Sequence, residues 1–321
     1  MSVGYSEMKQ VEKKDSESLP IRIYRVLTGR SIRGRDNVVA YTFLSIPLIY
    51  FSLFFFIPIS LDFLGSLYEG PSLISKGAKF IGLGNYARIL RDQTFLSSLK
   101  TTFFFILGTT GISVVLGLSL AILLNEKLML RGLMRSVIFF PYMTSLVIIA
   151  LIWSVIYDAD VGLLNWLLTR VGLPTQGWIS NPNTALISMI IMSIWWETGY
   201  DMVIFLAGLQ GIPQEYYDAA SVDGANAVQS FRHVTLPLLA PATFFVVIIS
   251  FFNSCQAFIQ PYVLTQGGPS QATNLAVFHI YNVAFLHLRL GEASAMAFFI
   301  FLIVLLVTAT LFKFWRTEVE Y

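Results

Sequence analysis

The sequence has little charge and a single cysteine. Of its 321 residues only 12% are Asp, Glu, Lys or Arg, and 55% are hydrophobic. Soluble domains carry about 25% charged residues, so this chain cannot cover a core with a polar surface in water. Its one cysteine, Cys255, excludes an intrachain disulfide and a cysteine-rich metal site. The formal net charge of +2 gives no indication of nucleic acid binding.

Several uncharged runs are long enough to cross a lipid bilayer as helices. A helix rises about 1.5 Å per residue, so about 20 apolar residues span the hydrocarbon. The runs are continuously apolar, whereas membrane β-strands alternate apolar and polar residues. We therefore predict an all-α membrane protein with six transmembrane helices, at 37–61, 101–125, 136–157, about 185–209, within 233–288 and at 293–312.

Lys and Arg are distributed unequally between the two sides that six spans define. The N-terminal segment, the alternate loops and the C-terminal end hold 14 of them, and the opposite side holds 7. By the positive-inside rule, both termini are expected in the cytoplasm. We predict a cytoplasmic tail at 1–36, a transmembrane domain at 37–315 and a cytoplasmic tail at 316–321. The first apolar run is too long for a cleavable signal and is expected to remain as an anchor.

The segment between the fourth and fifth spans, residues 211–237, has the pattern of two short helices joined by a turn. Pro213 suits the first turn of a helix, where a backbone N–H is not needed, and Glu215 adds negative charge near that N-terminus. Gly224 suits a left-handed helix stop. Because the predicted topology places this segment in the cytoplasm, we expect a helix–turn–helix on that face of the membrane.

The same segment resembles the cytoplasmic signature of the membrane subunits of ATP-binding cassette importers. That signature is Glu-Ala-Ala, three residues, Gly, nine residues, Ile, one residue, and Leu-Pro. This chain has, at the same spacing, Asp218-Ala219-Ala220, Gly224, Val234 and Leu236-Pro237. Three further segments, at 80–86, 262–269 and 291–296, look like those of the sugar-importing, maltose-type branch.

The resemblance implies the type I permease (MetI-like) fold of such importers, and it implies partners. The expected partners are a second, similar permease subunit in a heterodimer, two ATPase subunits and an extracytoplasmic solute-binding protein. The chain has no Gly-x-x-x-x-Gly-Lys-Ser/Thr phosphate loop, so we expect it not to be the ATPase, and we expect ATP and Mg²⁺ on the partner ATPase. It also lacks a catalytic constellation, so we expect it not to be a membrane enzyme of another kind. By resemblance, ATPase coupling is assigned to Glu215, Asp218, Ala219, Ala220, Gly224, Leu236 and Pro237.

Two carboxylates lie inside the fourth apolar run. Glu197 and Asp201 are four residues apart and share one helix face. An Asp at the centre of a membrane helix costs at least about 2.5 kcal/mol, so such residues are functional candidates by default. The predicted spans contain no Lys or Arg, so the partner must be water, a polar neighbour, another subunit or the substrate. Alternatively, the two carboxyls form hydrogen bonds that join helices.

The fifth span is rich in uncharged hydrogen-bonding groups, which carbohydrate recognition requires together with an aromatic side chain. Gapless alignment with the maltose-type family puts residues of spans four and five at positions that line a sugar path. Glu197 departs from the small residue expected there, and Ala257 from an amide, so the substrate can differ from maltose. The predicted path comprises Trp196, Glu197, Tyr200, Asp201, Ser250, Asn253, Ser254, Gln256, Ala257 and Gln260. Interhelical hydrogen bonding is the alternative role for the polar residues of span five.

We therefore predict the permease subunit of an ATP-driven importer of a sugar or oligosaccharide in a bacterial or archaeal cell (inner) membrane. One alternative is an importer of another solute, such as a glycerol-phosphate compound, although two carboxylates disfavour an anion. The other is a secondary transporter that uses Glu197 and Asp201 as an ion or proton relay. It predicts a pseudo-repeat between the halves, which the sequence does not show. No catalytic constellation and no metal site is predicted.

Overall fold

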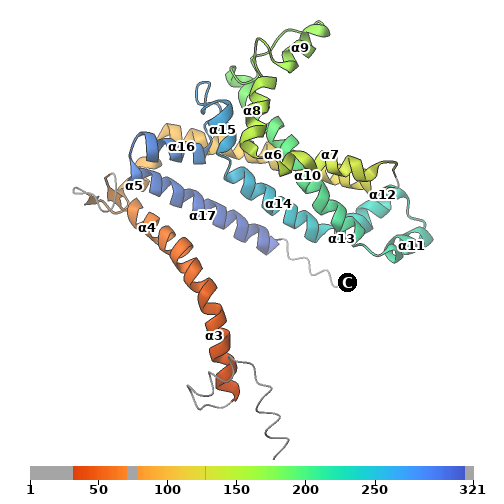
Figure 1. Ribbon diagram of the computed structural model, residues 1–321, viewed down its shortest axis with the longest axis horizontal. Helices are drawn as coiled ribbons and strands as arrows, with labels where there is room; N and C mark the ends of the chain where they lie inside the picture. Colours follow the sequence, from red (N-terminus) through yellow and green to blue (C-terminus); the bar gives the residue numbers. More distant parts are fainter. Residues whose placement is uncertain (1–31, 71–77, 127, 315–321) are drawn as a thin grey trace, which may run out of the picture. The chain divides into compact units, whose positions relative to one another are not determined.

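The computed structural model describes residues 32–70, 78–126 and 128–314, and most of this is helical (Figure 1). The one β-ladder in these ranges pairs β1 (Tyr68–Glu69) with β2 (Lys79–Phe80). Most of the predicted N-terminal tail and the whole predicted C-terminal tail lie outside the described residues. The chain divides into two units, residues 1–61 and 62–321, which are described separately.

The first unit contains helix α3 (Ile32–Phe51), a π-helical turn (Ser52–Phe56) and the start of α4 (Ile57–Ser66). Helix α3 begins at Ile32, inside the segment predicted as a tail. The π turn ends two residues before Pro58, which has no N–H and whose ring would collide with a carbonyl in a regular helix. No residue in the most apolar window of 39–66 is buried by the described chain, so this apolar surface requires lipid or another subunit as its neighbour.

Three further helices of the second unit are long and apolar enough to cross a membrane. They are α6 (Gln93–Asn125), α10 (Pro182–Gln210) and α17 (Leu290–Phe314). Side chains of Asp92 and Asn181 cap the first two by accepting hydrogen bonds from the backbone N–H groups of Thr94 and Asn183. With the span of the first unit, the described residues contain four such helices.

Two bent helix pairs raise this number to six if each pair is one span. Helices α7 (Arg131–Met143) and α8 (Leu146–Ile156) meet at 98°, so the uncharged run 136–157 does not form one straight helix. Pro141 lies at the end of α7, and its missing N–H weakens the turn before the break. The segment 227–238 meets α14 (Ala240–Cys255) at 66°, where Pro241 lacks the N–H needed to continue the preceding helix.

Helix α10 is the centre of the second unit and packs against α6, α7 and α14 (Figure 1). Glycines permit these close approaches. A Cβ on Gly199 would lie 2.2 Å from the backbone oxygen of Ile138 in α7, and one on Gly117 of α6 would lie 2.6 Å from the Asp201 Cβ. More than half of the most apolar window of α10 is buried, against about a quarter for α6. Polar side chains on α10 therefore face protein rather than lipid.

Shorter elements connect these helices. Before α6 lies α5 (Gly84–Ile89), and between α8 and α10 lies α9 (Leu163–Arg170). The segment after α10 forms α11 (Gln214–Val222), α12 (Ala227–Ser230), a π turn (Phe231–Thr235) and α13 (Leu236–Leu238). The segment after α14 forms α15 (Ile259–Leu264), α16 (Ala276–Tyr281) and a π turn (Asn282–Leu286).

Candidate functional site

The two carboxylates of α10 are fully enclosed by protein. Glu197 is 2% exposed and Asp201 is 0% exposed. Both accept hydrogen bonds from α14: Asn253 Nδ2 donates to Glu197 Oε1 at 3.1 Å, and Ser250 Oγ donates to Asp201 Oδ1 at 3.2 Å. The two donors lie about one helical turn apart, so the pairs form a ladder between α10 and α14.

No cation compensates these carboxylates in the described part of the chain. The ion pairs found there involve neither Glu197 nor Asp201. The second oxygen of Asp201, Oδ2, has no hydrogen-bond partner. A buried ionised carboxylate without a cation is costly. The hydrogen bonds from α14 agree with the alternative prediction, in which the two carboxyls join helices.

A cavity of about 320 Å³ opens where α14 ends and α15 begins. Seven of the ten residues predicted for the substrate path line it: Trp196, Glu197, Asn253, Ser254, Gln256, Ala257 and Gln260. The chain leaves the helical conformation after Cys255, so residues 256–258 form a link rather than a continuation of span five. The structure therefore brings together polar groups that the sequence places in one helix and its extension.

Three polar atoms of the cavity lining are buried and have no hydrogen-bond partner. They are Trp196 Nε1, Gln260 Oε1 and Thr109 Oγ1, and Gln260 is only 5% exposed. An indole N–H needs an acceptor and an amide oxygen needs a donor. A hydroxyl group is both, so a polyhydroxylated solute suits this lining.

Aromatic rings pack against one another beside the cavity. The ring of Tyr142, on α7, lies 4.8 Å from that of Trp196 and stacks on that of Tyr200 at 4.6 Å. Phe105 and Phe258 also line the cavity, so flat apolar faces adjoin the polar groups. Such a combination is typical of small-molecule sites, where a few polar groups orient a ligand against apolar walls.

The structure does not bring the other three predicted path residues into the cavity. Tyr200 stacks on Tyr142, whereas Asp201 and Ser250 bond to each other one turn away from the lining. Sequence reasoning missed the lining contributed by Phe105, Thr109, Leu146, Ser193, Phe258 and Ile259. Thr109 and Ser193 were detectable as polar residues within apolar runs, but the apolar lining residues have no such signal.

The predicted helix–turn–helix between spans four and five is confirmed. Helix α11 ends with Gly224 at φ +80°, and the N–H groups of Gly224 and Ala225 bond to the carbonyls of Ser221 and Ala220 at 3.1 and 2.9 Å. These two bonds form a Schellman motif, which requires a left-handed residue at the glycine position. Pro213 lies at the N-cap of α11, one residue before the first turn predicted for it.

The residues assigned to ATPase coupling lie around an open hollow in this segment. The hollow measures about 450 Å³ and is lined by Ala219, Ala220 and Gly224, together with residues of α12 and the following π turn. Glu215, Asp218, Leu236 and Pro237 are exposed. The Tyr217 hydroxyl lies 3.2 Å from the Thr235 hydroxyl and ties α11 to the π turn. The surface is thus preformed and accessible.

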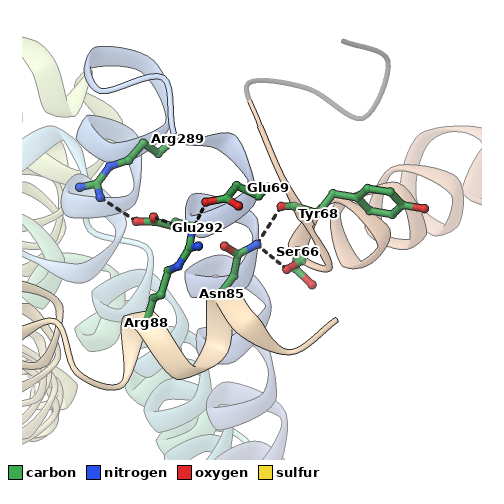
Figure 2. Close-up of polar contacts among 7 residues, drawn as sticks. All are labelled: Ser66, Tyr68, Glu69, Asn85, Arg88, Arg289 and Glu292. Carbon is green, nitrogen blue, oxygen red and sulfur yellow. Dashed lines mark hydrogen bonds and ion pairs between the residues drawn. The ribbon is translucent and has the colours of Figure 1, made fainter. Parts of the chain in front are cut away.

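A second polar cluster joins β1, α5 and the start of α17 (Figure 2). Arg88 lies 2.7 Å from Glu69 and 3.8 Å from Glu292, which also lies 3.0 Å from Arg289. The hydrogen bond from Arg88 holds the pKa of Glu69 below its ordinary value. We call Glu69, Arg88, Arg289 and Glu292 the outer cluster. Together with Asn85, it joins two of the segments noted in the sequence, 80–86 and 291–296. The ion pairs within it were not predicted.

A buried amide completes the outer cluster. Asn85 Nδ2 donates to the backbone oxygens of Ser66 and Tyr68, both at 2.8 Å (Figure 2). Gly291 lets α17 approach β1, since a Cβ there would lie 2.1 Å from the Tyr68 oxygen. Within the described residues, no three His, Cys, Asp or Glu side chains gather as a metal-binding group.

Comparison with known proteins shows similarity over most of the chain. The family described as "Binding-protein-dependent transport system inner membrane component" matches residues 113–316. The trehalose/maltose transport system permease protein of Thermococcus litoralis is 33% identical, over 89% of this chain and 96% of that one. The sn-glycerol-3-phosphate transport system permease protein of Agrobacterium fabrum is 30% identical, over 91% of this chain and 99% of that one.

A solved structure shares the fold. It is a chain of a bacterial alginate ABC transporter, crystallised in complex with an alginate pentasaccharide-bound periplasmic protein. The likeness has a TM-score of 0.74 at 20% sequence identity and covers 88% of this chain and 95% of that one.

Proposed function

Because the chain belongs to the binding-protein-dependent transport system inner membrane component family, we propose that its cavity between α10, α14 and α15 is part of a path for a sugar or oligosaccharide. The family makes the chain a multi-pass permease subunit of an ATP-driven importer, and not an enzyme. Membership of this family also argues against the alternative of a secondary transporter that uses Glu197 and Asp201 as an ion or proton relay.

The sugar substrate is supported by one observation above all. Trp196, Glu197 and Gln260, from two helices, line a single cavity, and the indole N–H of Trp196 and the amide oxygen of Gln260 have no hydrogen-bond partner in the described chain. Sugar rings offer an apolar face and hydroxyls that donate and accept, so each of these groups has a counterpart on such a solute. A glycerol-phosphate compound is the other candidate, because a permease for sn-glycerol 3-phosphate is 30% identical.

The proposed assembly contains this chain, a second similar permease subunit, two ATPase subunits that hold ATP and Mg²⁺, and an extracytoplasmic solute-binding protein. The excess of Lys and Arg on one side supports cytoplasmic termini. That orientation puts α11 to α13 in the cytoplasm. Their exposed hollow is then the surface that docks on an ATPase subunit and transmits its closure to α10 and α14.

The substrate path is tested by replacing one of two adjacent tryptophans. Trp196 lines the cavity, whereas Trp195 is exposed on another face of α10. In the complete importer in proteoliposomes, Trp196→Ala should lower ATP-dependent uptake of the sugar that the cognate solute-binding protein binds roughly tenfold, equivalent to about 1.4 kcal/mol. Trp195→Ala should leave it within about twofold. Equal losses in both variants would contradict the path.

The coupling surface is tested with two glycines of matched geometry. Gly224 and Gly172 both follow a helix and have positive φ, but the predicted topology puts them on opposite sides of the membrane. Gly224→Pro removes the N–H that binds Ser221 and forbids the left-handed conformation. We expect it to insert normally and to abolish substrate-stimulated ATP hydrolysis, whereas Gly172→Pro retains it. Undiminished stimulated hydrolysis in Gly224→Pro would remove the coupling assignment.

A further inference from the structure

The cavity of α10, α14 and α15 has an unusual charge distribution. Among the described residues that line it, Glu197 is the one with an ionisable side chain, and Lys, Arg and His are absent. The remaining lining is aromatic, aliphatic, hydroxyl or amide. The wall therefore carries a negative charge or none, and it offers no cation to a solute.

The surroundings of Glu197 do not supply the missing cation. Its Oε1 accepts the amide of Asn253, which is neutral. One turn along the same face, Asp201 is fully buried, its Oδ1 accepts from Ser250 and its Oδ2 is unpartnered. Two like charges at this spacing disfavour each other, so Asp201 adds acceptor oxygens beside Glu197 and no compensating cation. An electron-rich region thus extends from the cavity wall into the interface between α10 and α14.

This distribution affects solutes differently according to their charge. An anion that enters loses its hydration shell, meets a carboxylate and finds no Lys or Arg to replace the water. An uncharged sugar loses only hydroxyl hydration, and its hydroxyls can donate to Glu197 and Gln260 and accept from Trp196. Gln260 also lines the cavity, is more than nine-tenths buried, and has a side-chain oxygen without a hydrogen-bond partner, so the unsatisfied groups of this lining are neutral and none is a cation.

We propose that Glu197 makes this cavity selective by charge, so that it admits uncharged and cationic sugars and excludes anionic ones such as sugar phosphates and uronic acids. The inference rests on the proposed function, because it concerns the solute of the same path. It separates the two candidate substrates named above and favours the neutral sugar. Glu197 acts here as a specificity-determining residue.

The test measures the charge preference of the cavity without knowledge of the solute. In a Cys255→Ala background, Gln256→Cys puts a thiol on an exposed lining residue. The complete importer is treated with two methanethiosulfonates of similar size, one bearing trimethylammonium and one bearing sulfonate. Each forms a mixed disulfide with the thiol and releases methanesulfinate. The mass of this chain gives both rates, which are divided by the rates for 2-mercaptoethanol.

We expect the normalised rate for the cationic reagent to exceed that for the anionic one roughly tenfold, since the reagents differ by two unit charges in the field of Glu197. Glu197→Gln, which is nearly isosteric, should abolish most of this preference. Glu126→Gln removes a carboxylate at the exposed end of α6 and should retain it.

The proposal would be overturned by equal rates, by a preference for the anionic reagent, or by a preference unchanged by Glu197→Gln. A thiol that reacts with neither reagent would also overturn it, because the cavity would then admit no solute. Uptake assays on the same labelled importer test the path separately. Labelling with the expected preference but without loss of uptake would leave charge selection standing and contradict the proposed path.

Discussion

The two polar clusters of this chain differ in how their charges are balanced. The outer cluster of Glu69, Arg88, Arg289 and Glu292 pairs two acids with two bases at 2.7 to 3.8 Å, and most of its side chains are about half exposed. The inner cluster consists of Glu197 and Asp201 with their donors Asn253 and Ser250. It has two acids and no base, and both acids are fully buried. The cluster that is less accessible to solvent is therefore the one whose carboxylates have no paired cation.

This difference indicates different roles. The outer charges satisfy one another, and together with Asn85 they hold β1, α5 and α17 in one arrangement. The inner carboxylates are held by neutral donors from α14 and leave an oxygen of Asp201 unpartnered. Charge that is paired within the chain is sufficiently explained by structure. Charge that is left unpaired beside a cavity indicates interaction with something outside the chain.

The largest expected effect comes from the backbone contact that supports the outer cluster. Gly291→Leu forces a side chain into the space 2.1 Å from the Tyr68 oxygen. Because backbone cannot move aside as a side chain can, we expect a loss of about 3 kcal/mol or more in the free energy of unfolding. Thermal unfolding of the purified permease complex measures it. Gly111→Leu is the control, since a Cβ there meets nothing within 4 Å. Equal stability of the two variants would show that this contact is not tight.

Removal of a donor from the inner cluster should have the next largest effect. Ser250→Val deprives Asp201 Oδ1 of its hydrogen bond and leaves both carboxylate oxygens without a side-chain partner from α14. A buried unsatisfied group costs about 1–3 kcal/mol, and more when charged. Thermal unfolding should detect this, whereas Ser119→Val, on an exposed face of α6, should change little. An unchanged midpoint for Ser250→Val would mean that Asp201 does not depend on this donor.

Loss of a base from the outer cluster should have a smaller effect than loss of the inner donor. Arg88→Met removes both contacts of Arg88, but water and salt screen exposed ion pairs, so they stabilise little. We expect a midpoint slightly below that of the parent chain and an unchanged charge preference of the cavity. A destabilisation larger than that of Ser250→Val would reverse the contrast between the clusters.

The smallest expected effect is on the loss of stability at acidic pH. The hydrogen bond and the charge of Arg88 lower the pKa of Glu69 from its ordinary value of 4.5. The stabilisation that the ion pair of Glu69 with Arg88 gives the folded state is therefore present above the unfolded-state pKa of Glu69. It is lost as the pH falls through the lowered pKa of Glu69 in the folded state. Midpoints measured from pH 6 to pH 3 should fall slightly less in Arg88→Met than in the parent chain. Identical pH dependence in both would show that the pair contributes nothing.

Local patterns in the sequence were sufficient for some features. The turn at Gly224 follows from residue type and spacing, because a left-handed position after a helix excludes most side chains. The straight spans follow from apolar length, because the hydrocarbon thickness sets how many residues a helix needs, and six spans result when each bent pair is counted as one. The location of Trp196, Glu197 and Asn253 beside one cavity was predicted only through the resemblance to known importers.

Other features depended on contacts between distant parts of the chain. The 98° break after Pro141 and the end of α14 at Cys255 lie inside uncharged runs whose hydropathy does not indicate them. Asp201 is an acid on the same helix face as the lining residue Glu197, yet Gly117 brings α6 against it and Ser250 binds it away from the cavity. Hydropathy records the medium that a residue prefers, so the sequence by itself determined that the helices lie in a membrane. The residue type at Gly224 likewise determined where α11 stops. Which polar groups of the membrane helices meet across a cavity depends on how closely the backbones approach, and only the tertiary structure decided that.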